Sequence, residues 1–217
     1  ALWRAPWPLQ CFWRIAAGAL EGFAGHRHRA AWNVAGVEAP LPILPQLRHA
    51  EGIPMLRAPR EGEDIVADYA RMGLTLRRHP LALLRPALSQ KGVSGTAVLK
   101  DSKNGDIFTL AGLVLVRQRP GTASGVVFVT LEDESGIANL VVWPKVFEAH
   151  RRIVMGSRLL GVKGRVQREG PVIHLVAEQL WDWSADLDRI AEIDETFRLT
   201  TGRGDEVRTD PGDRRVA

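Results

Sequence analysis

Four acidic or hydroxyl side chains, Glu132, Asp133, Glu134 and Ser135, lie between two strand-like apolar runs in VFVTLEDESGIANLVVWPK, residues 127–145. Such a cluster could hold metal ions for nucleotidyl transfer. A two-metal site, however, needs carboxylates that converge from separate strands, whereas successive acids on one tight turn point in different directions. Asp and Ser bond their own backbone in turns, and Gly136 can adopt a positive φ. We therefore expect a hairpin turn, and we predict no catalytic residue and no metal site.

Two histidines in the run HRHR, His26 and His28, are the next candidates for chemistry. Metal sites usually need a third His, Cys or acid at a recognisable spacing, and none follows here. A basic surface cluster, with phosphate contact or plain solvent exposure as equal alternatives, is the favoured interpretation. The sequence also shows no Ser-His-Asp order, no phosphate-binding glycine loop and no setting for a nucleophilic cysteine.

The composition favours no class of partner strongly. A formal net charge of +4, from 29 basic and 25 acidic side chains, permits a polyanion such as nucleic acid without demanding one. The single cysteine, Cys11, cannot form an internal disulfide, which fits a reducing, cytoplasmic location. No run approaches the roughly 20 apolar residues of a transmembrane helix, so we expect no membrane partner.

Helical periodicity dominates the first part of the chain. Apolar residues recur every three or four positions from Phe12 to Phe23, and a second helix is expected over 27–34. Three prolines in 39–47 predict an extended linker. Segment 61–88 should contain a helix that ends at Gly73 and a shorter one that begins after Pro80.

The spacing of apolar residues changes to two after a Gly- and Ser-rich loop at 91–106. Strands are predicted at 107–119, with a bulge or bend at Gly112, and at 126–131 and 137–143. Pro144 opens a helix over 144–154, and a hairpin around 168–170 supplies two more strands.

Five strands with a helix between the third and the fourth is the order of the OB-fold, a small barrel that binds oligonucleotides. The predicted fold class is therefore α+β, with an N-terminal helical segment, a five-stranded OB-fold β-barrel and a flexible C-terminal tail. We assign residues 1–90 to the helical segment with its Pro-rich linker, 91–106 to a linker, 107–183 to the barrel domain, and 184–217 to a charged, largely flexible tail.

Strand alternation separates a barrel interior from an outer face. Val127, Val129 and Leu131, with Ala138, Leu140 and Val142, should fill the barrel. The outer face would carry rings that stack on bases, polar groups beside them, and basic side chains that follow the phosphates. The predicted nucleic-acid-binding residues are Arg117, Arg119, Phe128, Thr130, Asn139, Trp143, Lys163, Arg165 and His174.

The segment GLVLVRQRPGTASGVVFVTLEDESGIANLVVWPKVFE, residues 112–148, closely resembles the C-terminal OB domain of bacterial C-family error-prone DNA polymerases, the DnaE-like ImuC type. RLLGVKGRVQREGPVIHLVAEQLWD resembles the closing hairpin of that domain, and DYARMGLTLRRHPLALLRPAL the segment before it. HRHRAAWNVAGVEAPLPIL resembles the stretch after the family's helix-hairpin-helix region, and FRLTTGRGDEVR its C-terminus. Residues 1–22 match poorly.

The resemblance implies a C-terminal fragment of a much longer polymerase. In that family a palm domain holds three catalytic aspartates and Mg²⁺, and this chain has no matching segment, so we expect no activity from it alone and no cofactor within it. The implied role is contact with single-stranded DNA during damage-induced, mutagenic synthesis. The implied partners are ImuA-type and ImuB-type proteins and the sliding clamp.

Two other functions remain open. The barrel could be a protein-interaction module that docks polymerase partners while neighbouring domains contact the DNA. It could also be an anticodon-binding barrel of the kind found in class II tRNA synthetases, which shares the strand order and the LEDESG-type turn.

Overall fold

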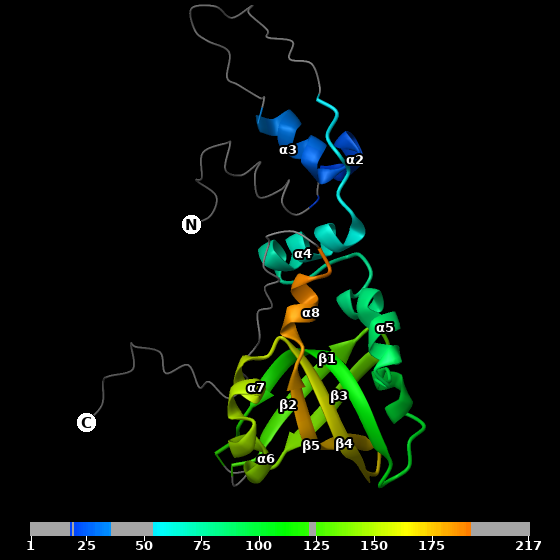
Figure 1. The fold of residues 1–217 in the computed structure, drawn as a ribbon, viewed down its shortest axis with the longest axis vertical. Coiled ribbons are helices and arrows are strands. Elements are labelled where there is room, and N and C mark those ends of the chain that lie inside the picture. The colour runs from blue at the N-terminus through cyan, green and yellow to red at the C-terminus, as the bar shows by residue number, and fades with distance from the viewer. Residues whose placement is uncertain (1–17, 19, 36–53, 122–124, 192–217) are drawn as a thin grey trace, which may run out of the picture. The chain divides into compact units, whose positions relative to one another are not determined.

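A computed structural model describes residues 18, 20–35, 54–121 and 125–191 (Figure 1). The chain divides into two compact units, one of Ala1–Arg77 with Ala191–Arg198 and one of Arg78–Ile190 with Leu199–Ala217. Among the described residues, the first unit is helical and the second contains the β-barrel. No helix within the described ranges is long and apolar enough to cross a membrane.

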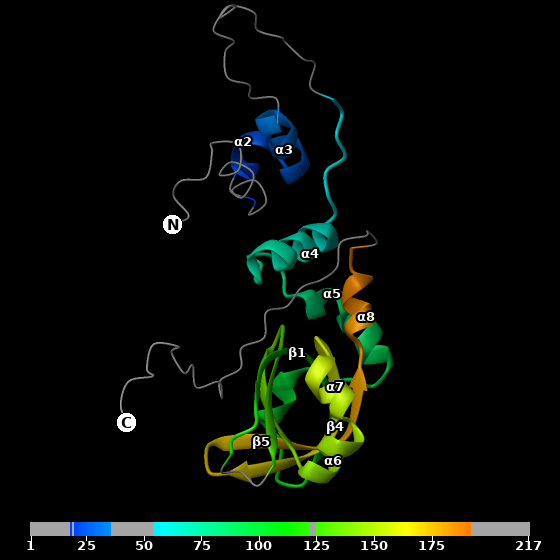
Figure 2. The same cartoon turned by 90° about the vertical axis from the view of Figure 1, so that its left-hand side faces the viewer.

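The barrel is closed by five strands in the order β1-β2-β3-β5-β4 (Figures 1 and 2). The strands are β1 (Ile107–Gln118), β2 (Val127–Asp133), β3 (Gly136–Val142), β4 (Leu159–Glu169) and β5 (Val172–Asp182). Only the β3–β5 pair is parallel. The predicted α+β class and the five-stranded OB-type barrel are confirmed, while the predicted flexible tail beyond Ala191 lies outside the described residues.

The barrel interior is filled by the residues that strand alternation selects. All six side chains predicted to point inward from β2 and β3 are at most 2% exposed. Leu110, Leu160 and Leu175 extend the same core from the other strands. Because each fully buried Val or Leu side chain contributes about 1.5–3 kcal/mol, this interior dominates the stability of the unit.

The first strand departs from prediction at its glycine. Gly112 lies in regular pairing, and the irregularity falls instead between Val114 and Val116. A Cβ at Gly112 would lie 2.7 Å from the Cβ of Leu131, so this position needs glycine for close approach between β1 and β2 rather than for a bend.

The segment after β3 forms two short helices rather than the single predicted one. α6 spans Pro144–Ala149 and α7 spans Arg151–Gly156, with His150 between them at φ −121°. Pro144 begins α6 as predicted. Phe147 of α6 and Val154 of α7 are buried in the barrel core, which explains why the chain bends to keep both side chains inside.

Helix α5 (Pro80–Gln90) and the 3₁₀ helix η2 (Thr96–Leu99) belong to the same compact unit as the barrel. The predicted linker at 91–106 therefore does not coincide with the division between units, which falls after Arg77. Contacts with the β2–β3 turn hold α5 and η2 against the barrel. The Asp133 carboxylate accepts hydrogen bonds from the backbone N–H and the hydroxyl of Thr96, both at 2.7 Å, and from Arg85 at 3.1 Å.

The acidic cluster is thus the expected hairpin turn. The N–H groups of Ser135 and Gly136 donate to Asp133 at 2.7 and 3.0 Å, and Glu134 pairs with Arg85 at 2.5 Å. Burial alone would raise the pKa of Asp133, but hydrogen bonds from Ser135 and Thr96 outweigh it and hold this pKa below its usual value. The carboxyl groups of Asp133 and Glu134 therefore bind partners within the fold.

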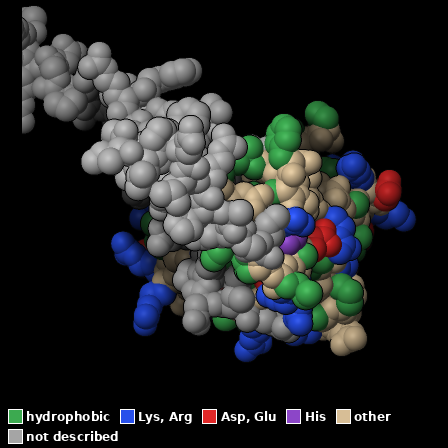
Figure 3. Space-filling view, turned by 90° about the horizontal axis from the view of Figure 1, so that it is seen from above, with side chains coloured by type: hydrophobic (Ala, Val, Ile, Leu, Met, Phe, Trp, Pro, Cys, Tyr) green, Lys and Arg blue, Asp and Glu red, His purple; other side chains and the backbone are tan. Residues whose placement is uncertain are grey.

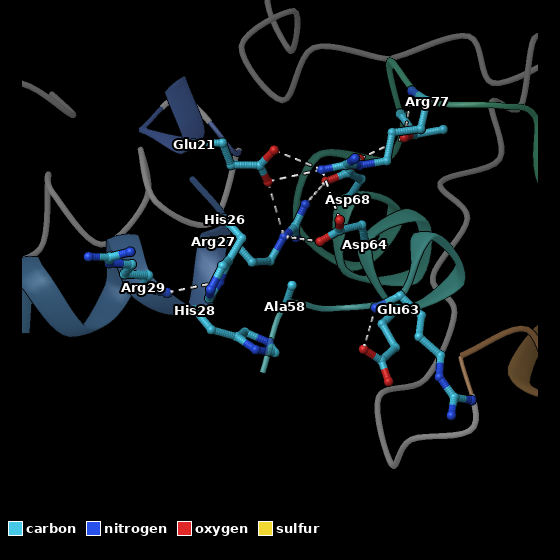
Figure 4. A network of polar contacts seen from close by, with 12 residues as sticks. Glu21, His26, Arg27, His28, Arg29, Ala58, Glu63, Asp64, Asp68 and Arg77 are labelled. Carbon is cyan, nitrogen blue, oxygen red and sulfur yellow. Dashed lines mark hydrogen bonds and ion pairs between the residues drawn. The ribbon is translucent and has the colours of Figure 1, made fainter. Parts of the chain in front are cut away.

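The first unit is built around a buried ionic network (Figure 4). Arg27, in α3 (Arg27–Ala35), lies 2.6 Å from Asp64 and 2.6 Å from Asp68, which are one turn apart in α4 (Glu61–Met72). Arg77 joins the network through Asp64 at 2.9 Å and through Glu21 of α2 (Glu21–Ala24) at 2.8 Å. The expectation of a surface basic cluster is wrong for Arg27, because this acidic pair draws its guanidinium into the interior, where it is 6% exposed.

The remaining helical predictions have mixed outcomes. Gly73 ends α4 at φ 73°, and Pro80 begins α5, both as predicted. Of the helix expected from Phe12 to Phe23, the described part holds only α2, and the Pro-rich segment 39–47 lies outside the described residues. After β5 the chain forms α8 (Ser184–Asp188), where we had expected a flexible tail.

Replacement of Asp133 tests the role of the turn. Asp133→Asn puts an amide N–H₂ group among donors and breaks a buried ion pair, so we expect a loss of about 3 kcal/mol in the free energy of unfolding, measured with urea. Glu134→Gln is the matched control, since this side chain is 24% exposed, and it should cost under about 1 kcal/mol. Equal losses for the two variants would contradict the assigned role.

The histidine at the start of α5 predicts a pH dependence. His79 accepts a hydrogen bond from the backbone N–H of Leu81 at 3.2 Å, and burial lowers its pKa below 6.5. The folded state therefore disfavours the protonated ring, so stability should be full above about pH 6.5 and fall as the pH drops below that value. His79→Asn keeps a capping acceptor but cannot titrate, and urea denaturation at pH 7.5 and 5.5 should show a smaller difference for this variant than for the wild type.

Candidate nucleic-acid interface

The strand register assembles two parallel rows of side chains on the outer face of the barrel. Thr130 pairs with Asn139, Asn139 with His174, and His174 with Gln167. These four residues are called the polar row. Two residues further along each strand, Phe128 pairs with Val141 and Val141 pairs with Val176. These three residues are called the apolar row. Cross-strand partners lie side by side on one face, so the rows run across β2, β3 and β5, and the polar row continues onto β4.

Two aromatic rings lie on this wall. Phe128 is half-buried in the apolar row. Trp143 follows β3 in an extended conformation, with φ −66° and ψ 151°, two residues beyond Val141, and its side chain is 52% exposed. The alternation that turns Val141 outward therefore turns Trp143 to the same side, which gives the arrangement that the sequence predicted for the two rings.

Arg117 is turned away from this wall. The bulge near Leu115 adds one residue to β1 and inverts the alternation after it, so that Arg117 pairs with the inward-facing Val129. Its Nε donates to the carbonyl of Val154 at 2.5 Å, and its Nη2 donates to the carbonyl of Ser157. Burial lowers the pKa of the guanidinium. Arg117 therefore fixes the end of α7 and is not placed to bind phosphate.

Arg119 lies at the α6 end of the barrel together with a basic residue that sequence reasoning missed. The Arg119 guanidinium carbon is 5.0 Å from the centre of the Phe147 ring, and that of Arg151 is 5.7 Å from the same ring. Both arginines are exposed. The predicted helix over 144–154 already contained Arg151, but its position over the same ring as Arg119 depends on how α6 and α7 fold back on the barrel. These two residues are called the cation pair.

The predicted basic residues of β4 lie elsewhere on the outer wall. Arg165 on β4 pairs with Val176 on β5, which in turn pairs with Val141 on β3. It donates to the carbonyl of Gly105 at 3.1 Å and pairs with Glu178 at 3.5 Å. Lys163 is half-buried opposite Thr109. Arg165 thus continues the apolar row onto β4, beside Gln167 of the polar row, whereas Arg119 and Arg151 lie over the Phe147 ring of α6.

His174 is the predicted residue whose surroundings are most unusual. It occupies the middle of the polar row, and its Nδ1 atom is buried without a hydrogen-bond partner among the described residues. Such orphaned atoms are uncommon in folded proteins, because an unpaired polar group loses its hydration without compensation. Sequence alone could not predict this, because the burial of one ring nitrogen depends on the packing of residues that are distant in the chain.

The electrostatic character of the surface is mixed. On the face drawn in Figure 3, basic side chains are interspersed with acidic and hydrophobic ones among the described residues. Within the described ranges, no group of three or more His, Cys, Asp or Glu residues could hold a metal ion. The arrangement supports stacking and polar contacts more than a strong electrostatic attraction.

Comparison with known proteins agrees with this geometry. Residues 108–182 match a family described as an OB-fold nucleic acid binding domain. The chain is 50% identical over 183 residues to an error-prone DNA polymerase of Methylococcus capsulatus, with 84% of this chain and 18% of that protein covered. It is 54% identical over 168 residues to an error-prone DNA polymerase of Alkalilimnicola ehrlichii, with 77% and 16% covered.

A third relative, error-prone DNA polymerase 2 of Rhizobium meliloti, is 47% identical over 197 residues, with 86% of this chain and 18% of that protein covered. The chain thus spans 16–18% of the length of these curated relatives. It is homologous to error-prone DNA polymerases over most of its length and contains an OB-fold nucleic acid binding domain.

The two arginines at the end of β1 should respond differently to truncation. Arg117→Ala leaves two backbone carbonyls without their buried donor, so we expect a loss of about 2–3 kcal/mol in the free energy of unfolding. Arg119→Ala removes an exposed cation from an aromatic ring and should cost under about 1 kcal/mol. Urea denaturation measures both. If Arg117→Ala left stability unchanged but weakened oligonucleotide binding, Arg117 would belong to the interface after all.

Proposed function

We propose that this chain is the C-terminal region of an ImuC-type error-prone DNA polymerase and that it binds single-stranded DNA through the outer wall of its barrel. The observation that carries the proposal is the shared location of the rings and the polar row. Phe128 and Trp143 offer faces for base stacking, and the polar row lies one step away on the same wall. Aromatic faces bind bases with little regard to sequence, as a polymerase that copies varied templates requires.

The phosphates are assigned to the cation pair. A guanidinium that lies over a ring keeps its positive charge, which attracts a phosphate. Arg119 directly follows β1, Arg151 begins α7, and both guanidinium groups lie over the Phe147 ring of α6. Each phosphate-contacting cation releases a condensed counterion, so affinity for single strands should fall as salt rises.

The chain is proposed to be non-catalytic by itself. Its carboxyl cluster at the β2–β3 turn is already committed to Thr96 and Arg85. The relatives are more than five times longer than their matched segments, which leaves room for a separate catalytic domain that would hold Mg²⁺. Damage-induced translesion synthesis would then be the activity of the longer polymerase, with this barrel holding single-stranded template.

A protein-docking role is the second candidate. In the first unit, Phe23 is 91% exposed and Leu76 is 95% exposed. Each of these side chains leaves apolar surface that a partner protein would cover on binding. ImuA-type and ImuB-type proteins and the sliding clamp are the proposed partners. Capture of an ImuB-type protein by a chain that binds no oligonucleotide would favour this candidate over the first.

The stacking role can be tested with one substitution. Phe128→Ala should weaken binding of a fluorescent oligo(dT) by about 1–3 kcal/mol, measured by anisotropy at fixed salt, because it removes one stacking ring. Val172→Ala, an apolar truncation at a 46% exposed site on β5, is the control. A loss below a few tenths of a kcal/mol for a folded Phe128→Ala variant would exclude stacking at this residue. Stronger binding of tRNA than of single-stranded DNA would favour the anticodon-type function.

The cation pair can be tested through salt dependence. Replacement of both Arg119 and Arg151 by Ala should reduce the slope of log K against log salt by about 1.4, because each contact on a single strand contributes about 0.7. Arg165→Ala is the control, since Arg165 is already bonded to Gly105 and Glu178, and its slope should match that of the wild type. The reverse pattern would move the phosphate path to β4.

A further inference from the structure

We infer that the first, helical unit docks on the rest of a longer polymerase through a strip of exposed apolar side chains, Met72, Leu74 and Leu76. These three residues are called the exposed strip. The inference rests on the proposed function only in placing this chain within a longer polymerase. It goes beyond that function because it assigns an interface to a unit that the DNA-binding wall does not use.

The described part of the first unit has an unusual distribution of charged and apolar side chains. Four charged residues are only 5–6% exposed, namely Arg27, Glu63, Asp64 and Asp68. Six large apolar residues are exposed, namely Phe23, Trp32, Met55, Met72, Leu74 and Leu76. Charged residues are rarely buried, and apolar surface that is continuous on a monomer usually marks a contact site. The unit therefore has the surface of an element that is covered in its complete setting.

The exposed strip is continuous along the chain. It begins at Met72, the last residue of α4, and occupies alternate positions in the loop that follows. The exposed fraction rises along it, from 38% at Met72 to 53% at Leu74 and 95% at Leu76. Three large apolar side chains within five residues thus face solvent together, which distinguishes this loop from singly exposed apolar residues elsewhere.

The ionic network holds the strip in this exposed position. The Thr75 hydroxyl donates to Asp68 at 2.6 Å, and the Arg77 guanidinium pairs with Asp64 at 2.9 Å. Both residues that alternate with the two leucines are therefore bound to the buried acids of α4. The leucines cannot turn inward without breaking these contacts, so the exposure of the strip is fixed by the fold of the unit.

The described residues supply the first unit with a small apolar core. Ile65 and Val66 are fully buried, and Tyr69 is 8% exposed. Small cores stabilise a unit weakly, and a buried ionic network adds little net stability because its charges lose their hydration. An interface that buried the exposed strip would add apolar burial to this unit.

The occupant is an apolar surface of the same polymerase, in the part that lies outside this chain. This chain spans 18% of the Methylococcus capsulatus relative, so the rest of such a protein is available to cover the strip. Permanent interfaces are more hydrophobic than those of partners that bind and leave. The strip offers three apolar side chains and no charged one, which fits permanent contact within one protein better than exchange between separate partners.

The test compares backbone hydrogen exchange in the isolated chain and in a full-length chimera, in which this chain replaces the 50% identical segment of the Methylococcus capsulatus polymerase. Amides of residues 72–76 should exchange about 10-fold or more slowly in the chimera, because docking suppresses local opening. The double variant Leu74→Asp and Leu76→Asp should restore the faster rate. Val172→Asp, at a 46% exposed site on β5, is the control and should leave the protection unchanged.

Primer extension checks that the chimera is assembled. If the chimera is inactive, the intact Methylococcus capsulatus polymerase is compared with its own matched segment in the same way. The double variant of the isolated chain should unfold at the same urea concentration as the wild type, because the strip is exposed there. A lower midpoint would show that the strip packs within this chain, and it would overturn the inference.

The remaining outcomes distinguish the possible occupants. Equal exchange of residues 72–76 in the isolated chain and the chimera would overturn the inference. Protection of the isolated chain that rises with its concentration would indicate a second copy, and protection only after an ImuB-type protein is added would indicate a separate partner. Both would also overturn it. Failure of the isolated chain to bind oligo(dT) would overturn the proposed DNA-binding function and leave the measured protection unaffected.

Discussion

Closure of the five-stranded sheet is the constraint on which the rest of this structure depends. Once β1 pairs with both β2 and β4, every strand must turn alternate residues into a narrow interior, and the remaining residues form the outer wall. The apolar and polar rows are therefore by-products of core formation. A single extra residue near Leu115 inverts this rule for the end of β1 and turns Arg117 inward, where it fixes α7. The closed sheet therefore forms the outer wall and also turns Arg117, which was predicted to lie on it, away from that wall.

The carboxyl cluster shows how residues suited to chemistry can be committed to structure. A catalytic carboxylate needs free lone pairs, whereas Asp133 accepts hydrogen bonds from Thr96, Ser135, Gly136 and Arg85. These bonds join the β2–β3 turn to α5 and η2, so the segment before the barrel is part of its folded unit. The same reasoning applies to Arg27 in the first unit, whose charge is neutralised by Asp64 and Asp68. In both places a charged side chain that could have served a function makes buried hydrogen bonds or ion pairs within the fold instead.

Local sequence patterns correctly predicted features that depend on neighbouring residues in the chain. They failed for features that depend on contacts between distant segments. The period of two in β2 and β3 correctly placed Val129 and Leu140 inside and Phe128 outside, because pleating alone sets that alternation. The position of Gly73 and Pro80 followed from backbone preferences. In contrast, the bulge in β1, the inward turn of Arg117 and the placement of Arg119 and Arg151 over the Phe147 ring require tertiary contacts that no local spacing encodes. The buried, unpaired Nδ1 atom of His174 belongs to the same class, because its burial depends on tertiary packing.

The separation of the cations has a consequence for how such a barrel can bind a strand. With Lys163 and Arg165 on β4, and Arg119 and Arg151 near α6, no continuous basic groove follows the rings across the described wall. If the barrel binds single-stranded DNA as proposed, electrostatic attraction would hold one end of the strand, and stacking with polar contacts would supply the rest of the free energy. Binding of that kind is modest in affinity and easily reversed. It suits a module held near its ligand by a longer chain, because tethering raises the effective concentration and makes high intrinsic affinity unnecessary.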